Sequence, residues 1–115
     1  MIESKERKSA FLRETIRTLG LHDTQVETER FEVFADRESA QGMADFVTVR
    51  AVRTDDELIS TVRKLLKLNG QMLMFRPPHA AGPDPAGFAR GVTVPLVEAP
   101  PSFLIVYRRV FHVEQ

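Results

Sequence analysis

The chain has 115 residues, of which 43% are hydrophobic and 28% charged, values that are ordinary for a single globular domain and that argue against disorder or a membrane span. Sixteen basic residues balance sixteen acidic ones, so any binding of RNA is expected to depend on a local patch. The absence of cysteine excludes disulfides, thiol catalysis and cysteine-based metal sites, and the charged N-terminus does not have the pattern of a signal peptide. We therefore expect a cytoplasmic protein.

The first thirty residues predict a strand end, a helix and a second short strand. Residues 1–3 have the pattern of a strand end, and Ser4 is placed to cap a helix over residues 5–19. Gly20 then favours a left-handed helix ending. Residues 25–29 predict the second strand. The apolar side chains of the helix fall on one face, which is expected to pack on other elements, and they are Phe11, Leu12, Ile16 and Leu19.

Residues 30–43 are less regular, and we expect a loop with one helical turn around residues 34–39. A strand–helix–strand unit follows, because residues 46–50 are β-branched and aromatic, residues 55–67 have a helical period, and residues 71–75 return to a strand pattern. These strands are predicted to be parallel neighbours, with Thr54 capping the helix and Asn69-Gly70 ending it. The helix has one apolar stripe, formed by Leu58, Ile59, Val62, Leu65 and Leu66.

The last third begins with a connection rich in proline and glycine over residues 77–91. Residues 92–97 and 103–111 predict two strands, and the short link between them favours an antiparallel pair. Pro95 places the first of these strands at a sheet edge, since proline cannot donate to the ladder. The three histidines, His22, His79 and His112, have no spacing typical of a metal site or a catalytic triad, and we expect no metal.

Four polar residues directly follow predicted strands, and they are Glu3, Arg30, Arg50 and Arg76. In an open parallel sheet, ligands bind outside the carboxyl ends of the strands, so these side chains are expected to share one rim. A carboxylate there suits ribose hydroxyls, and arginines suit a carboxylate or phosphate. The alternative is that polar residues simply end the strands.

Segments spread over most of the chain have the pattern of a known family, and they are Glu3-Ser4, residues 7–14, Leu19-Gly20-Leu21, Val26-Glu27, Arg30, Glu32, residues 44–52 and residues 65–70. They resemble the RsmG (GidB) methyltransferases. That family uses S-adenosylmethionine to methylate a guanine N7 in small-subunit ribosomal RNA, on a class I, Rossmann-like sheet. The resemblance is strong in the first three quarters of the chain and weak from Pro77 onward.

The resemblance implies a set of site residues and a cofactor. Glu3 takes the position of the acid that holds the ribose of S-adenosylmethionine, and Arg30, Phe31 and Glu32 take that of the loop beside the adenine. Arg50 matches an arginine where cofactor and substrate meet. Independently of the resemblance, the position of Arg76 directly after the next predicted strand makes it the second residue expected to bind substrate.

The same resemblance implies an incomplete fold. The first strand of a class I sheet and the glycine-rich turn after it have no counterpart in these residues. We therefore expect one truncated, mostly parallel α/β domain with a C-terminal antiparallel strand pair. The missing strand belongs at the centre of the sheet, so its two neighbours are left with unpaired edges, and we expect a homodimer that closes the gap.

Three functions are compatible with these features. The first is a truncated methyltransferase-like protein with an incomplete cofactor site and weak or no activity alone. The second is a non-catalytic homodimerising module derived from that fold. The third is a small protein that binds RNA, such as ribosomal RNA, through the basic residues of its first helix, which are Arg7, Lys8, Arg13 and Arg17.

Overall fold

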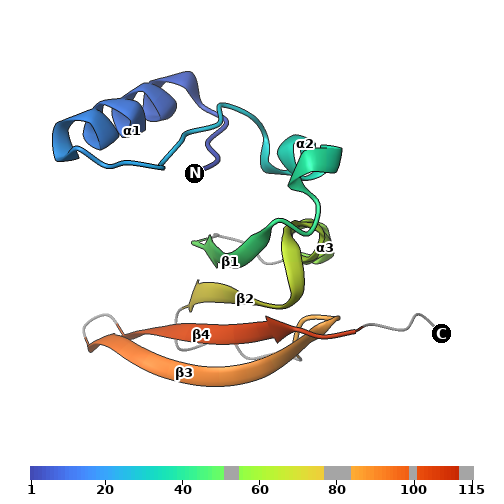
Figure 1. Ribbon diagram of the computed structural model, residues 1–115. Coiled ribbons are helices and arrows are strands. Elements are labelled where there is room, and N and C mark those ends of the chain that lie inside the picture. The colour runs from blue at the N-terminus through green and yellow to red at the C-terminus, as the bar shows by residue number, and fades with distance from the viewer. Residues whose placement is uncertain (51–54, 77–83, 99–100, 112–115) are drawn as a thin grey trace.

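The computed structural model describes residues 1–50, 55–76, 84–98 and 101–111. It is an α/β fold in which one four-stranded sheet has the strand order β1-β2-β4-β3 (Figure 1). None of the helices in these residues is long and apolar enough to cross a membrane. The strands are β1 (Ala44–Val49), β2 (Leu66–Arg76), β3 (Phe88–Glu98) and β4 (Pro101–Arg109), and the helices are α1 (Glu6–Leu19), α2 (Phe31–Ala35), α3 (Asp56–Leu65) and the short 3-10 helix η1 (Glu38–Ala40).

The predicted strand–helix–strand unit is confirmed, because β1 and β2 are parallel neighbours joined through α3. The N-cap of α3 is Asp55 rather than Thr54, which lies outside the described residues. The Asp55 carboxylate accepts a hydrogen bond from the Leu58 backbone N–H at 2.9 Å. Acidic residues in the first turn and basic residues in the last also complement the helix dipole.

The predicted end of this helix is wrong. Helix α3 stops at Leu65, and Leu66 is already extended, so Asn69-Gly70 lies inside β2 instead of closing the helix. Asn69 has a φ of 68°, at the point where the β1–β2 register shifts. A Cβ added to Gly70 would lie 2.8 Å from the Lys67 carbonyl oxygen and 3.2 Å from that of Ala44. The glycine therefore permits the close approach of these two strands.

The hydrophobic core lies on the face of the sheet that α3 covers. The apolar stripe of α3 is buried there as predicted, with Val62 fully buried. Met72 and Met74 of β2 are also buried, and β-sheet register places them beside Val47 and Val49 of β1. Tyr107 and Ile105 of β4 continue this face.

The opposite face of the sheet is apolar but open. Side chains alternate along a strand, so the partners of the core residues in the register point the other way. We call this surface the open face, and none of its members is buried. It consists of Phe46 in β1, Leu73 and Phe75 in β2, Val94 in β3, and Leu104 and Val106 in β4.

The C-terminal strands form the predicted antiparallel pair, and β3 with Pro95 is an edge strand as expected. Strand β3 begins at Phe88, four residues before the predicted start. The described sheet is mixed rather than mostly parallel, since β1–β2 is parallel while β2–β4 and β4–β3 are antiparallel. The strands predicted at residues 1–3 and 25–29 are not part of this sheet. They form one isolated parallel bridge between Ile2 and Glu27.

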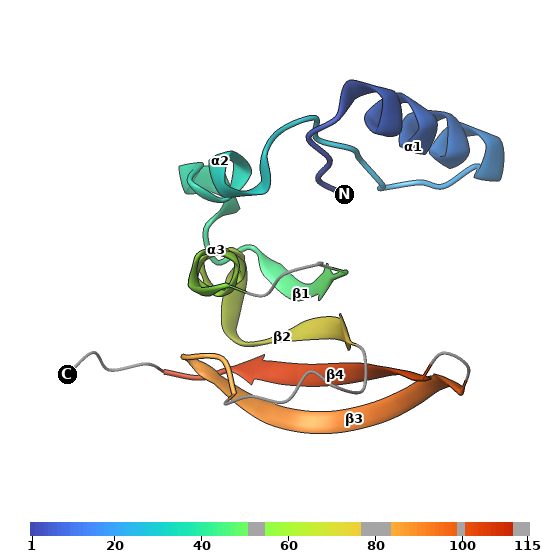
Figure 2. The ribbon, with the colours of Figure 1, turned by 180° about the vertical axis from the view of Figure 1, so that it is seen from behind.

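Around that bridge the N-terminal segment makes its own small unit, which Figures 1 and 2 show beyond β1. The Glu3 N–H donates a hydrogen bond to the Glu27 carbonyl oxygen at 3.0 Å, and the Glu27 N–H donates one to the Met1 carbonyl oxygen at 2.8 Å. Helix α1 is capped by Lys5 rather than Ser4, without a side-chain bond, and Gly20 closes it in the predicted left-handed conformation. The predicted loop after this unit contains α2 and η1.

Candidate functional site

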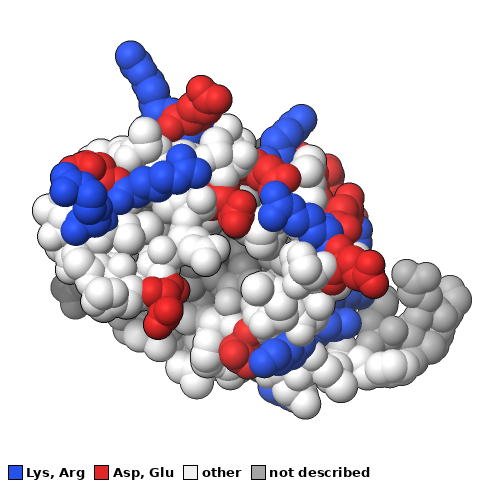
Figure 3. All heavy atoms as spheres, turned by 45° about the horizontal axis from the view of Figure 1, so that its top comes forward, with Lys and Arg blue, Asp and Glu red and all other residues white. Residues whose placement is uncertain are grey.

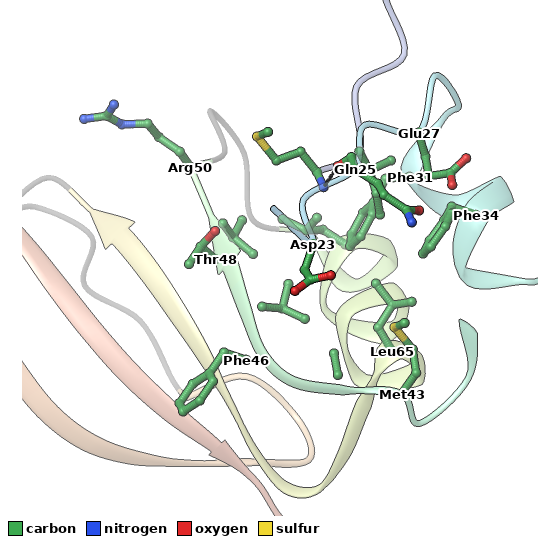
Figure 4. Close-up of a pocket in the computed structure, with 16 residues that line it drawn as sticks. Asp23, Gln25, Glu27, Phe31, Phe34, Met43, Phe46, Thr48, Arg50 and Leu65 are labelled. Atoms are coloured by element: carbon green, nitrogen blue, oxygen red, sulfur yellow. Dashed lines mark hydrogen bonds between the residues drawn. The ribbon is translucent and has the colours of Figure 1, made fainter. Parts of the chain in front are cut away.

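A cavity of about 660 Å³ lies between the Ile2–Glu27 bridge and the outer edge of β1 (Figure 4). Three parts of the chain form its walls: the N-terminal unit, helices α2 and α3, and β1 with the residue after it. These parts are far apart in the sequence. The cavity therefore exists only because the fold brings the N-terminal unit beside the edge of the sheet.

The walls of the cavity combine apolar side chains with a few polar groups. Phe31, Phe34, Leu58 and Leu65 from the two helices make the apolar part. Figure 4 shows the Asp23 carboxylate in the space between the N-terminal unit and β1. Asp23 has a φ of 57°, and its carboxylate makes no hydrogen bond or ion pair with any residue in the described part of the chain. The other polar lining residues are Gln25, Glu27, Thr48 and Arg50.

Two of the predicted site residues meet at this cavity. Phe31, the first residue of α2, and Arg50, directly after β1, both line it. The Arg50 guanidinium lies over the Phe75 ring, 5.4 Å from the ring centroid, so a residue of the open face orients it. Phe31 thus offers an aromatic ring at the cavity wall, whereas Figure 4 shows the Arg50 guanidinium at the rim, directed away from the other lining side chains.

The other predicted site residues are not among the described residues that line the cavity. A Glu3 carboxylate oxygen accepts from the Lys5 backbone N–H at 3.2 Å. Arg30 precedes α2, and its Nε lies 3.1 Å from a carboxylate oxygen of Glu32. Arg76 is the last residue of β2 and is half-buried. The expected single rim of one carboxylate and three guanidiniums is therefore not formed around this cavity.

Sequence reasoning did not single out Asp23, Gln25 and Phe34, which also line the cavity. One signal for Gln25 and Glu27 was present, because alternation along the predicted strand places both on the side opposite the buried Val26. Asp23 had no such signal. Its position depends on a left-handed turn after α1, which a sequence pattern does not specify for this residue type.

The basic residues of α1 are partly engaged within the molecule. The Arg13 guanidinium donates to the Thr28 hydroxyl at 2.8 Å and to the Val26 carbonyl at 3.2 Å. Arg17 pairs with Glu14. Figure 3 shows acidic and basic side chains interspersed over this side of the molecule. Within the described ranges there is also no group of three histidine, cysteine, aspartate or glutamate residues able to hold a metal ion.

The fold is similar to that of a solved S-adenosylmethionine-dependent methyltransferase and to that of MtNAS. A SAM-dependent methyltransferase from Aquifex aeolicus superposes with a TM-score of 0.72 at 14% identity, over 95% of this chain and 67% of that one. A solved mutant of MtNAS, in complex with S-adenosylmethionine, superposes with a TM-score of 0.70 at 15% identity, over 96% of this chain and 44% of that one.

Sequence comparison gives the family. The profile of the family described as rRNA small subunit methyltransferase G (GidB) matches residues 1–82, and the chain belongs to this family. The ribosomal RNA small subunit methyltransferase G of Acidothermus cellulolyticus is 36% identical over 116 residues, which cover 94% of this chain and 50% of that protein. The enzyme of the same name from a Synechococcus strain is 34% identical over 97 residues, covering 84% and 37%. The chain thus spans half or less of the length of these relatives.

Proposed function

We propose that this chain is a cytoplasmic methyltransferase-like protein that keeps part of an S-adenosylmethionine site and has weak or no activity alone. The observation that carries the proposal is that Phe31 and Arg50, two of the predicted site residues, both belong to the lining of one cavity. Its volume, about 660 Å³, falls in the range of roughly 300–1,000 Å³ that is typical of small-molecule sites. The family of the chain supports the choice of cofactor, and ribosomal RNA is the proposed substrate class.

The residues present fit the cofactor in part. Phe31 and Phe34 offer aromatic surface for an adenine ring, and Arg50 offers a cation for a carboxylate. The Glu3 carboxylate, proposed to hold the ribose, instead caps the Lys5 N–H. When bound, the cofactor supplies a sulfonium methyl group, whose transfer to a ring nitrogen depends mainly on positioning. A site with only part of its contacts is expected to position it poorly.

Calorimetric titration with S-adenosylmethionine and S-adenosylhomocysteine tests this proposal. We expect weak binding, with a Kd on the order of 1 mM, equivalent to about −4 kcal/mol. Arg50→Ala is expected to remove most of the heat, whereas Arg17→Ala, on the exposed side of α1, leaves it unchanged. Absence of heat from the unaltered chain at millimolar ligand contradicts the proposal.

A second candidate is a non-catalytic homodimerising module. It is favoured by the outer edge of β1, which pairs with no strand of the described residues, and by the open face, where Phe46 is 63% exposed. Edges and apolar faces of this kind recruit partners. Sedimentation velocity distinguishes the two candidates, because a stable dimer without affinity for S-adenosylmethionine supports the module, and a monomer at high micromolar concentration rejects it.

A further inference from the structure

Arg37, which lies between α2 and η1, contacts two walls of the cavity at once. Its guanidinium carbon lies 5.1 Å from the centroid of the Phe34 ring, and Phe34 lines the cavity from α2. The same guanidinium pairs with Glu29, and one of its terminal nitrogens lies 3.8 Å from a carboxylate oxygen of Glu27, a lining residue of the N-terminal unit. Figure 4 shows Phe34 and Glu27 on the same side of the cavity. One side chain therefore joins the wall made by α2 to the wall made by residues 25–29.

A guanidinium suits this position better than any other side chain. It donates from two sides of a rigid fork, and its flat face stacks on an aromatic ring. Alternation along residues 25–29 places Glu27 and Glu29 on the same side of that segment, so their negative charges require a cation nearby. The Arg37 side chain is 44% exposed and that of Glu29 only 24% exposed, so water screens their attraction only in part.

The two walls are also joined in other ways that do not by themselves fix their relative orientation. The chain passes directly from Glu29 through Arg30 into α2, and Arg30 is extended and makes no side-chain cap. Ile2 of the N-terminal unit packs against the small buried cluster that contains Ala35 and Leu65. A single backbone connection allows the segment to turn about it. The contacts of Arg37 provide a further attachment, of ionic character, that opposes this turning.

We propose that Arg37 is a positioning residue for the cavity, which holds α2 and residues 25–29 at the separation that lets both walls contact one bound ligand. The inference rests on the proposed function for the identity of that ligand, S-adenosylmethionine. Arg37 is not among the described residues that line the cavity, so it acts through Phe34 and Glu27. Its loss leaves the lining residues present but no longer held together.

The separation of the two walls can be measured with a pair of spin labels, because the chain contains no cysteine that would react with them. Lys8→Cys on α1 and Ser60→Cys on α3 are suitable positions, since both residues are exposed and neither lines the cavity. Helix α1 follows residues 25–29, because Arg13 donates to the Val26 carbonyl and the Thr28 hydroxyl. Helix α3 follows the other wall, because α2 packs on it.

Double electron–electron resonance is expected to give a narrow distribution of distances between the labels when Arg37 is present. Arg37→Met, which keeps a long side chain but removes the charge, is expected to broaden or lengthen this distribution. Arg17→Met is the matched control, because Arg17 pairs with a glutamate on the exposed side of α1, and it is expected to change nothing. Salt at about 1 M is expected to broaden the distribution without any substitution at Arg37, since it screens partly exposed ion pairs. This second measurement does not depend on the folding of a variant.

Calorimetric titration of the Arg37 and Arg17 variants with S-adenosylmethionine links the distance to binding. Arg37→Met is expected to weaken binding about threefold, in keeping with the modest strength of partly exposed ion pairs, and Arg17→Met is expected to have no effect. A distance distribution that neither Arg37→Met nor salt changes overturns the inference, and so does a broadened distribution with undiminished binding. A distribution that responds, in a chain that gives no heat with the cofactor, contradicts the proposed function and leaves the role of Arg37 standing. Heat without any change in the distribution does the reverse.

Discussion

The chain contains two predicted amphipathic helices, and the structure buries the apolar side chains of one more than those of the other. In α3 the last residue, Leu65, is 3% exposed, whereas in α1 the last residue, Leu19, is 65% exposed. Both are leucines at the end of a helix with an apolar stripe. Helix α3 lies on a sheet of four strands, while α1 accompanies only a single bridge between two short segments. An apolar stripe is buried only when the surface that it faces is also present.

The largest expected effect comes from shortening these two leucines. Leu65→Ala is expected to lower the free energy of unfolding by about 2–5 kcal/mol, because it removes buried contacts and leaves a cavity. Leu19→Ala is expected to change it by less than about 0.5 kcal/mol, as is usual for an exposed position. Urea denaturation followed by circular dichroism measures both. Similar losses for the two variants would mean that α1 is packed in solution.

Two glycines extend the comparison to the backbone. Gly70→Ala is expected to cost about 1–3 kcal/mol, because its Cβ would meet the Lys67 and Ala44 carbonyl oxygens. Gly20→Ala has open space around the added Cβ, and only its φ of 65° opposes the change, so we expect about 1 kcal/mol. The thermal unfolding midpoints of the two variants show which substitution lowers the stability more. A larger loss at Gly20 would contradict the close strand approach at Gly70.

The helix caps give a smaller contrast. Asp55→Ala removes the hydrogen bond to the Leu58 N–H and is expected to cost about 1 kcal/mol. Lys5→Ala removes a side chain that makes no capping bond, and we expect a change near zero. Chemical denaturation measures both variants. If the two differ by less than the error of the method, Asp55 does not act as the cap.

The smallest effects concern the surface of α1. The Arg17–Glu14 pair is exposed, and Arg17→Ala is expected to cost no more than about 0.5 kcal/mol. The Arg13 guanidinium reaches the Thr28 hydroxyl and the Val26 carbonyl, so Arg13→Ala is expected to cost more than Arg17→Ala. Thermal unfolding in low salt compares them. Equal losses would indicate that α1 is not tied to residues 25–29.

Much of the fold was predictable because local patterns and tertiary structure agree there. The parallel β1–β2 pair, the buried stripe of α3, the antiparallel C-terminal strands and the edge position of Pro95 were all predicted from periodicity and turn residues. The end of α3 was not, because Asn69-Gly70 has the composition of a helix C-cap but serves a register shift in β2. The surface that covers a helix was also not predictable, as the exposed Phe11 shows.

The site was less predictable than the fold. Arg50 was selected from its place after a predicted strand and Phe31 from the family resemblance, and both line the cavity. Glu3 and Arg30 were selected by the same rule and have partners elsewhere. The rule assumes a continuous sheet whose strand ends share one rim. In this chain the described sheet ends at β1. Strand-end residues on the two sides of the cavity therefore do not share one rim.

Hydrogen exchange at the backbone amides of β1 tests the central claim most directly. The amides on the outer edge of Ala44–Val49 are expected to exchange much faster than those of β2, because no strand in the described part of the chain pairs with that edge. Amides on this edge of β1 that exchange as slowly as those of β2 in a monomer would contradict the account.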